Sequence, residues 1–118
     1  MPELPVQPVR NPGTAGVNIT YRTSGSSTDP LDTANMFTFQ NDGRSVVLAK
    51  LGGSSANITV HANKQIDGLA LPDRAVVLTS NRDRIIGPFD PDVYNNDDGE
   101  VELEFSAVAN LSIAVLRL

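Results

Sequence analysis

The sequence predicts an all-β protein: a single-domain, two-layer β-sandwich of the jelly-roll or Greek-key type with an extended proline-rich N-terminal arm. Three observations predict this fold. Apolar residues recur with a period of two, no window shows a sustained helical period, and turn signals recur about every eight to twelve residues. Roughly seven to nine short strands with this spacing are typical of a sandwich, and a small closed barrel is the alternative.

Residues 1–16 form the predicted arm and residues 17–118 the predicted sandwich domain. The arm holds half of the eight prolines, namely Pro2, Pro5, Pro8 and Pro12. Proline disfavours helix interiors and central strands and pushes the preceding residue into extended geometry, so we expect a stiff arm that reaches outward. Its apolar side chains Leu4, Val6 and Val9 are candidate contacts with a partner. The alternative is an ordinary frayed terminus.

The first half of the domain is expected to begin with a strand and a hairpin. Residues 17–22 alternate apolar and polar side chains, which predicts a strand with one buried face. Residues 36–40 and 45–50 are two further strand-like runs, joined by the turn Asn41-Asp42-Gly43. An Asp-Gly pair between two such runs predicts a hairpin, because glycine accepts the positive φ that the turn requires.

The middle of the domain repeats this pattern. Residues 57–62 are a predicted strand with His61 on its polar face, and residues 67–73 are a predicted loop with at most one short helical turn. The apolar runs at residues 76–78 and 85–86 flank a polar turn, so we expect them to pair as a second hairpin.

The last two predicted strands differ in their patterns. Residues 101–105 alternate cleanly between apolar and acidic side chains, which indicates one buried and one exposed face. Residues 111–118 are apolar on both faces apart from Ser112 and Arg117. A strand with two apolar faces belongs in the middle of a sheet or under a partner, because an exposed one invites aggregation.

Composition excludes several classes of function. Nine basic residues against fourteen acidic ones give a net charge of −5, the wrong sign for holding nucleic acid. No apolar run approaches the length of a membrane span, and the N-terminus lacks the pattern of a signal peptide, so we expect a soluble protein. Without cysteine the chain has no disulfide, no thiolate metal site and no cysteine nucleophile.

Acidic residues are concentrated between residues 90 and 104, which hold half of the fourteen acids. Three alternatives remain open for them: a solvated face, a surface that meets a basic partner, and a calcium site, although the spacing does not fit a calcium loop. The candidate partner contacts here are Asp90, Asp92, Tyr94 and Glu102. The side chains of Glu100, Glu102 and Glu104 should point to one face of their strand.

The single histidine, His61, offers no catalytic constellation. No spacing in the chain supplies a zinc site around it, and there is no Gly-x-Ser-x-Gly elbow to provide a nucleophile. We therefore interpret it as a surface histidine and predict that the protein is not an enzyme and uses no cofactor.

A set of short motifs is spread over roughly residues 35–118: Asn41-Asp42-Gly43-Arg44, Asp67-Gly68-Leu69-Ala70, Asp73-Arg74, Ile86-Gly87-Pro88-Phe89, Tyr94-Asn95, Gly99-Glu100-Val101 and Leu111-Ser112-Ile113-Ala114-Val115-Leu116-Arg117-Leu118. With these motifs the chain resembles small β-rich virion proteins of tailed bacteriophages, in particular head decoration, or cement, proteins. The resemblance implies a non-catalytic protein whose copies assemble, often as trimers, on the outer face of a capsid and bridge neighbouring capsid subunits.

The expected function is thus structural. The expected partners are the major capsid protein and further copies of the chain, with a trimer favoured, on the outer surface of a virion made in the host cytoplasm. An acidic protein suits that surface because packaged DNA repels it. The alternative is a receptor- or glycan-binding β-module of a phage tail or surface assembly, which would bind through residues 90–98 and Tyr94. A small hydrolase is a third, weaker hypothesis, because no catalytic constellation supports it.

Overall fold

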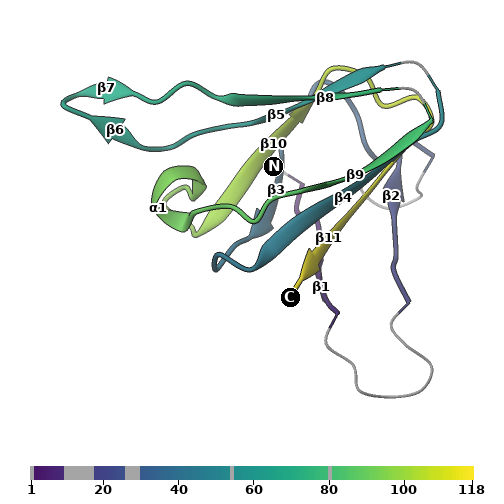
Figure 1. Ribbon diagram of the computed structural model, residues 1–118, viewed down its shortest axis with the longest axis horizontal. Helices are drawn as coiled ribbons and strands as arrows, with labels where there is room; N and C mark the ends of the chain where they lie inside the picture. The colour runs from purple at the N-terminus through teal and green to yellow at the C-terminus, as the bar shows by residue number, and fades with distance from the viewer. Residues whose placement is uncertain (1, 10–17, 26–29, 54, 80) are drawn as a thin grey trace.

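Two β-sheets make up nearly all of the regular structure (Figure 1). The computed structural model describes residues 2–9, 18–25, 30–53, 55–79 and 81–118. The first sheet contains β1 (Val6–Pro8), β2 (Arg22–Thr23), β4 (Ser45–Leu51), β9 (Arg82–Ile86) and β11 (Leu111–Arg117). The second contains β3 (Phe37–Gln40), β5 (Ala56–Val60), β8 (Arg74–Leu78) and β10 (Glu100–Phe105). The prediction of a β-rich, two-sheet domain is therefore confirmed.

The strand pairs are nested around the connection between β5 and β8. Antiparallel pairs join β5 to β8, β4 to β9, β3 to β10 and β2 to β11, in that order outward along the chain. Successive pairs fall in alternate sheets, giving the orders β1-β11-β4-β9, with β2 also on β11, and β3-β10-β5-β8. The chain is thus a long two-stranded ribbon that is bent back and forth to form two layers.

This nesting shows that both predicted hairpins are wrong. The turn after β3 leads into β4 in the other sheet, and the chain likewise changes sheets between β8 and β9. Gly43 does take the positive φ that the turn signal implies, at 91°. The Asn41-Asp42-Gly43 turn reverses the chain, but burial of apolar side chains decides which strands pair. β3 and β4 lie in different sheets, and their apolar faces pack against each other in one core.

Two further segments differ from the prediction. Residues 18–21 form no strand, β2 covers only Arg22–Thr23, and Ile19 is 37% exposed, while residue 17 lies outside the described residues. The predicted loop at residues 67–73 begins inside a small hairpin of β6 (Gln65–Ile66) and β7 (Leu69–Ala70). Asp67 and Gly68 close it with positive φ values of 52° and 80°, the combination that a tight hairpin turn favours.

The core forms between the two sheets. In β10 the residues Val101, Leu103 and Phe105 are buried while the intervening glutamates face outward, so the predicted alternation is confirmed. Phe105 packs on Phe37 with ring centroids 5.5 Å apart. β11 lies inside its sheet and is flanked by β4 on one side and by β1 and β2 on the other, as its two apolar faces predict.

The N-terminal segment closes one side of the two-sheet structure instead of reaching outward. The Thr38 backbone N–H donates to the Pro2 carbonyl at 2.9 Å, and the Leu4 N–H donates to the Thr38 carbonyl at 2.7 Å. The chain then changes sheets and β1 pairs in parallel with β11. Leu4 is only 2% exposed and belongs to the core, so the prediction of an outward arm is wrong for residues 2–9. Residues 10–16 lie outside the described residues.

We expect Leu4→Ala to lower the free energy of unfolding by about 2–5 kcal/mol, because it removes a fully buried side chain at the seam between the sheets. Leu69→Ala is the matched control, since Leu69 is 74% exposed and its truncation should cost less than about 0.5 kcal/mol. Urea unfolding of both variants checks this expectation. Equal stability of the two variants would show that the N-terminal segment does not contribute to the core.

Candidate interaction surface

The side of the structure opposite the N-terminal segment is open. β8 pairs only with β5 and β9 only with β4, so one edge of each strand has no neighbour among the described strands. Only Leu78 and Ile86 are buried in these two strands. Val77 is 57% exposed and Ile85 68% exposed. Both are β-branched apolar residues, which are unusual on an unpaired edge that must stay soluble.

Three arginines line the same edge. Arg74, Arg82 and Arg84 are exposed, and none has an ion-pair partner among the described residues. Each is paired across the ladder with a buried residue, Val60, Leu51 and Ala49 respectively, so the arginines project from the core-facing side of the two edge strands. Their aliphatic stems can cover apolar surface there while the guanidinium groups stay in water.

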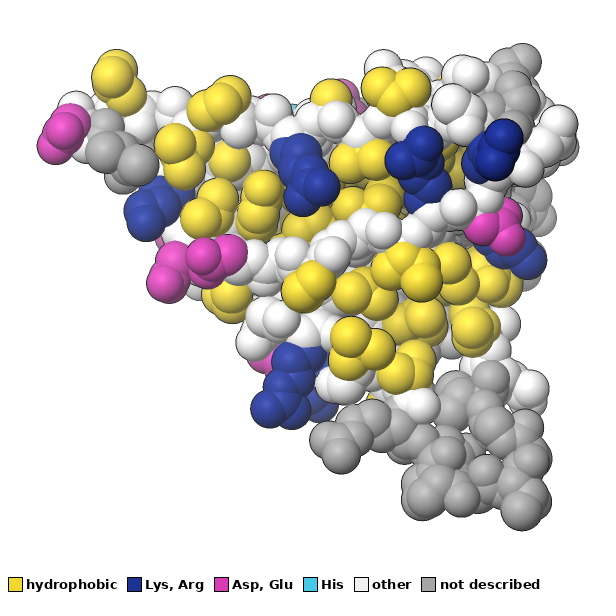
Figure 2. All heavy atoms as spheres, viewed as in Figure 1, with side chains coloured by type: hydrophobic (Ala, Val, Ile, Leu, Met, Phe, Trp, Pro, Cys, Tyr) yellow, Lys and Arg dark blue, Asp and Glu magenta, His cyan; other side chains and the backbone are white. Residues whose placement is uncertain are grey.

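We define Arg74, Val77, Arg82, Arg84 and Ile85 as the open edge. Figure 2 shows this side of the molecule, with Lys and Arg side chains spaced over β8 and β9 and hydrophobic side chains between them. Val77 pairs across the ladder with Asn57 and Ile85 with Leu48, so these two side chains project from the outer faces of their sheets and flank the arginines. Arginine is enriched in protein interfaces. Sequence reasoning missed this surface, because the runs at residues 76–78 and 85–86 were expected to pair with each other.

A second surface, the acidic end, surrounds the short helix α1 (Pro91–Tyr94). Asp90 caps the helix by accepting the Asp92 N–H at 2.9 Å, and Pro91 occupies its first turn. Sequence reasoning missed this helix although Asp-Pro is a known start signal. Asp92, Asp97 and Asp98 are exposed and have no cationic partner among the described residues. We define Asp90, Asp92, Asp97 and Asp98 as the acidic end.

The acidic end is fixed to the body of the protein. The Asn41 Nδ2 donates to Asn95 Oδ1 at 2.7 Å, and the Asn95 Nδ2 donates back to the Asn41 carbonyl at 2.9 Å. Tyr94 is half-buried, with its ring 5.7 Å from that of Phe89 in an edge-on arrangement. Tyr94 therefore packs against the core and is not a freely exposed platform.

The three glutamates of β10 point to one face, as predicted, but they are half-buried and each has a partner. Glu100 accepts from the Thr38 hydroxyl at 3.3 Å, and Glu102 accepts from the Asn63 amide at 3.3 Å. Glu104 lies 3.1 Å from His61. These three glutamates, including the candidate contact Glu102, therefore already interact with other side chains of the same chain.

His61 is held between two carboxylates. Its Nδ1 lies 2.8 Å from Asp73 Oδ2 and its Nε2 lies 3.1 Å from Glu104 Oε2, while its side chain is only 17% exposed. His61 lies one residue beyond the end of β5, not within the strand, and the prediction of an ordinary surface histidine is wrong. Both ring nitrogens can donate only when the imidazole is protonated, so that form makes both bonds. The cluster links the residue that follows β5 with β10 and with the segment before β8. Among the described residues no group of three or more His, Asp or Glu side chains is arranged to hold a metal ion.

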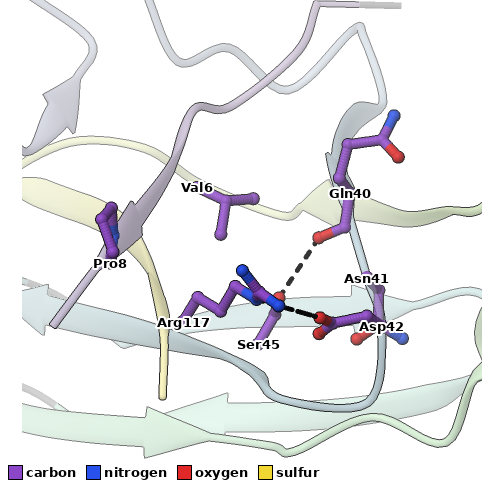
Figure 3. A pocket seen from close by; sticks show the side chains of 7 residues that line it. All are labelled: Val6, Pro8, Gln40, Asn41, Asp42, Ser45 and Arg117. Atoms are coloured by element: carbon purple, nitrogen blue, oxygen red, sulfur yellow. Dashed lines mark hydrogen bonds and ion pairs between the residues drawn. The ribbon is translucent and has the colours of Figure 1, made fainter. Parts of the chain in front are cut away.

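A cleft of about 360 Å³ lies beside β1 (Figure 3). Its lining comprises Val6, Pro8, Gln40, Asn41, Asp42, Ser45 and Arg117. The guanidinium of Arg117 lies 2.7 Å from the Asp42 carboxylate, and the Ser45 hydroxyl donates to the Gln40 carbonyl at 3.2 Å. The charges in the cleft thus neutralise each other, and β1 supplies its apolar wall. This arrangement can accept a small apolar group from a partner.

The seven predicted contact residues do not form one surface in the structure. Leu4 is in the core, Val6 lines the cleft, and Val9 is half-buried where its N–H donates to the Arg117 carbonyl at 3.0 Å. The other four, Asp90, Asp92, Tyr94 and Glu102, lie on or near α1 and on β10. Of the seven, only Val6 lines the cleft.

Comparison of the chain with protein-family models, with curated proteins and with solved structures gives no significant match. The one helix that the structure describes is far too short to cross a membrane.

We expect the Asp42 carboxyl to titrate below its usual range. The Arg44 backbone N–H, followed by the guanidinium of Arg117, holds the pKa of Asp42 down. A lowered pKa in the folded state means that this contribution to stability is present above the unfolded pKa and is lost as the pH falls through the folded pKa. Carboxyl NMR titration checks it: Arg117→Gln should move the Asp42 midpoint upward, and an unchanged midpoint would contradict the role of Arg117.

Proposed function

We propose that this chain is a non-catalytic structural protein of a phage virion, which decorates the outer surface of the capsid and stabilises it by bridging capsid subunits. The observation that carries the proposal is the open edge, which combines exposed apolar side chains with arginines that have no ion-pair partner among the described residues. Such a surface is explained by assembly with a protein partner.

The connectivity supports the structural class. We infer a jelly roll, because eight strands nested as four antiparallel pairs, with successive pairs in alternate sheets, follow the double Greek-key plan of that fold. Jelly rolls are common in viral capsid domains and in lectins. The choice of a phage capsid as the partner comes from the resemblance of residues 35–118 to decoration proteins.

Charge favours the outer surface of a capsid. The chain carries a net charge of −5, and residues 87–116 contain seven acids and no lysine or arginine. Packaged DNA would repel such a surface, whereas the outside of a shell imposes no such penalty.

In this proposal the N-terminal segment stabilises the core and is no longer an arm that reaches outward to the capsid. Because Leu4 is part of the core, deletion of residues 1–16 would disturb the fold as well as any contact with the shell. Within the segment, Val6 and the cleft beside it are the features that can meet a capsid subunit.

The position of Tyr94 makes glycan binding a weaker proposal than capsid decoration. Carbohydrate sites use exposed aromatic faces, and Tyr94 is half-buried against Phe89. Binding of a glycan by the pure chain, lost in Tyr94→Ala, would nevertheless reverse this ranking.

We expect the recombinant chain to co-sediment with capsid shells that have been stripped of it, and to raise the temperature at which those shells disrupt. The double variant Val77→Glu, Ile85→Glu should bind at least tenfold more weakly, because it places carboxylates on the apolar part of the open edge. The control is Leu69→Glu, which changes a still more exposed residue on the β6–β7 hairpin and should bind like the unaltered chain.

Two outcomes would overturn this proposal. One is location of the protein in the tail of purified particles. The other is equal shell binding by the edge variant and by the Leu69→Glu control.

A further inference from the structure

Three Asp-Gly pairs occur in the chain, at residues 42–43, 67–68 and 98–99. In such a pair the glycine nitrogen can attack the carboxyl carbon of the aspartate, because glycine has no side chain to block the approach. The attack needs a glycine N–H that is not engaged in a hydrogen bond and a carboxyl group that can turn towards it. The partners that the fold gives to these two groups therefore decide which pair can react.

The pair at residues 67–68 has both groups free of such partners. Asp67 and Gly68 form the turn of the β6–β7 hairpin, which projects away from the two sheets (Figure 1). Both residues are exposed, and a Cβ added at Gly68 would meet no atom within 4 Å. Among the described residues, neither the Gly68 N–H nor the Asp67 carboxylate has a hydrogen-bond or ion-pair partner. The two reacting groups thus break no hydrogen bond of the described chain when they meet.

The fold engages the glycine N–H of the other two pairs. The Gly43 N–H donates to Asn41 Oδ1 at 3.0 Å, and the Gly99 N–H donates to the Asn96 carbonyl at 3.1 Å. Each of these hydrogen bonds has to open before the nitrogen can attack, and the need for a local opening lowers the population that reacts. The pairs at residues 42–43 and 98–99 are therefore protected in the folded chain.

The carboxylate of Asp42 is engaged as well. It accepts the Arg44 N–H at 3.1 Å and lies 2.7 Å from the Arg117 guanidinium. The Arg44 N–H, followed by Arg117, holds the pKa of Asp42 below its usual range. Ring closure expels a carboxyl oxygen as water and so proceeds from the protonated acid. The fold thus protects this aspartate at both reacting groups.

We propose that Asp67 is a site of spontaneous modification, at which the folded chain slowly converts aspartate to isoaspartate. The Gly68 nitrogen forms a bond to Asp67 Cγ, and the N–H proton and the carboxyl hydroxyl leave together as water. The product is a succinimide ring. Water then adds to the ring at the Asp67 main-chain carbonyl carbon and breaks the bond from this carbon to the Gly68 nitrogen, so that the chain continues through Cγ. The water lost in the first step is regained in the second, and no other reactant is needed.

The modification changes the hairpin and spares the core. Isoaspartate adds one carbon, Cβ, to the main chain of a turn that Asp67 and Gly68 form with φ values of 52° and 80°. The longer turn no longer matches the ladder in which Ile66 pairs with Leu69. Leu69 is exposed, so the change does not reach the core. This inference is independent of the proposed function, because it concerns the free chain.

The experiment is incubation of the full chain in mildly acidic buffer, with samples taken over several weeks. Proteolytic peptides that contain residues 42, 67 and 98 are analysed by electron-transfer fragmentation, which distinguishes isoaspartate from aspartate although their masses are equal. We expect isoaspartate to accumulate at residue 67, and about tenfold more slowly at residues 42 and 98, because a hydrogen bond has to open at those two positions.

The same incubation in concentrated urea is the matched control. Unfolding removes the hydrogen bonds at all three pairs, so we expect isoaspartate to form at comparable rates at residues 42, 67 and 98. The variant Asp67→Glu keeps the charge but would have to close a larger ring. Its residue 67 should therefore stay unmodified, while residues 42 and 98 behave as in the unaltered chain.

Three results would overturn the inference. Equal accumulation at all three positions of the folded chain would show that the hydrogen bonds give no protection. Absence of isoaspartate at residue 67 of the folded chain, with formation there in urea, would show that the hairpin turn prevents the reaction. A preference for residue 67 that persists unchanged in urea would assign the selectivity to the local sequence and not to the fold. None of these measurements uses capsid shells, so each result leaves the proposed function as it stands.

Discussion

The nested pairing of four strand pairs determines which strands lie inside the two sheets and which lie at their edges. Each pair outward from β5–β8 joins segments that are farther apart in the chain, so the outer pairs close only when the apolar faces of both sheets meet. The same nesting leaves β8 and β9 at the edges of their sheets. The open edge is thus a direct result of the connectivity, while the N-terminal segment covers the other side.

Which side chains of a single strand are buried could be predicted from the sequence, but which strands pair with each other could not. The alternation in β10 and the two apolar faces of β11 are determined by burial of their own side chains, and both predictions are confirmed. The two hairpin predictions failed because an Asn41-Asp42-Gly43 turn fixes only the local reversal of the chain. Whether the strands that flank it pair or separate into two sheets depends on contacts with segments far away in the sequence.

The candidate surfaces were only partly predictable for the same reason. The acidic segment could be recognised from composition, and Asp92 is indeed exposed there. Tyr94 and Glu102 looked equally available, yet the first packs on Phe89 and the second accepts a hydrogen bond from Asn63. Val77 and Ile85 have the sequence pattern of buried strands, and their exposure follows from their place on the outer faces of the edge strands β8 and β9, opposite Asn57 and Leu48. The partners of His61 come from β10 and from the segment before β8, so no local spacing could reveal them.

We propose that the open edge is a binding surface that becomes covered when the protein assembles. Backbone hydrogen–deuterium exchange, compared between the dilute free chain and the chain bound on capsid shells, tests it most directly. We expect slower exchange in β8 and β9 of the bound chain and unchanged exchange in the β6–β7 hairpin. Equal exchange in β8 and β9 in both states would show that assembly does not cover the open edge.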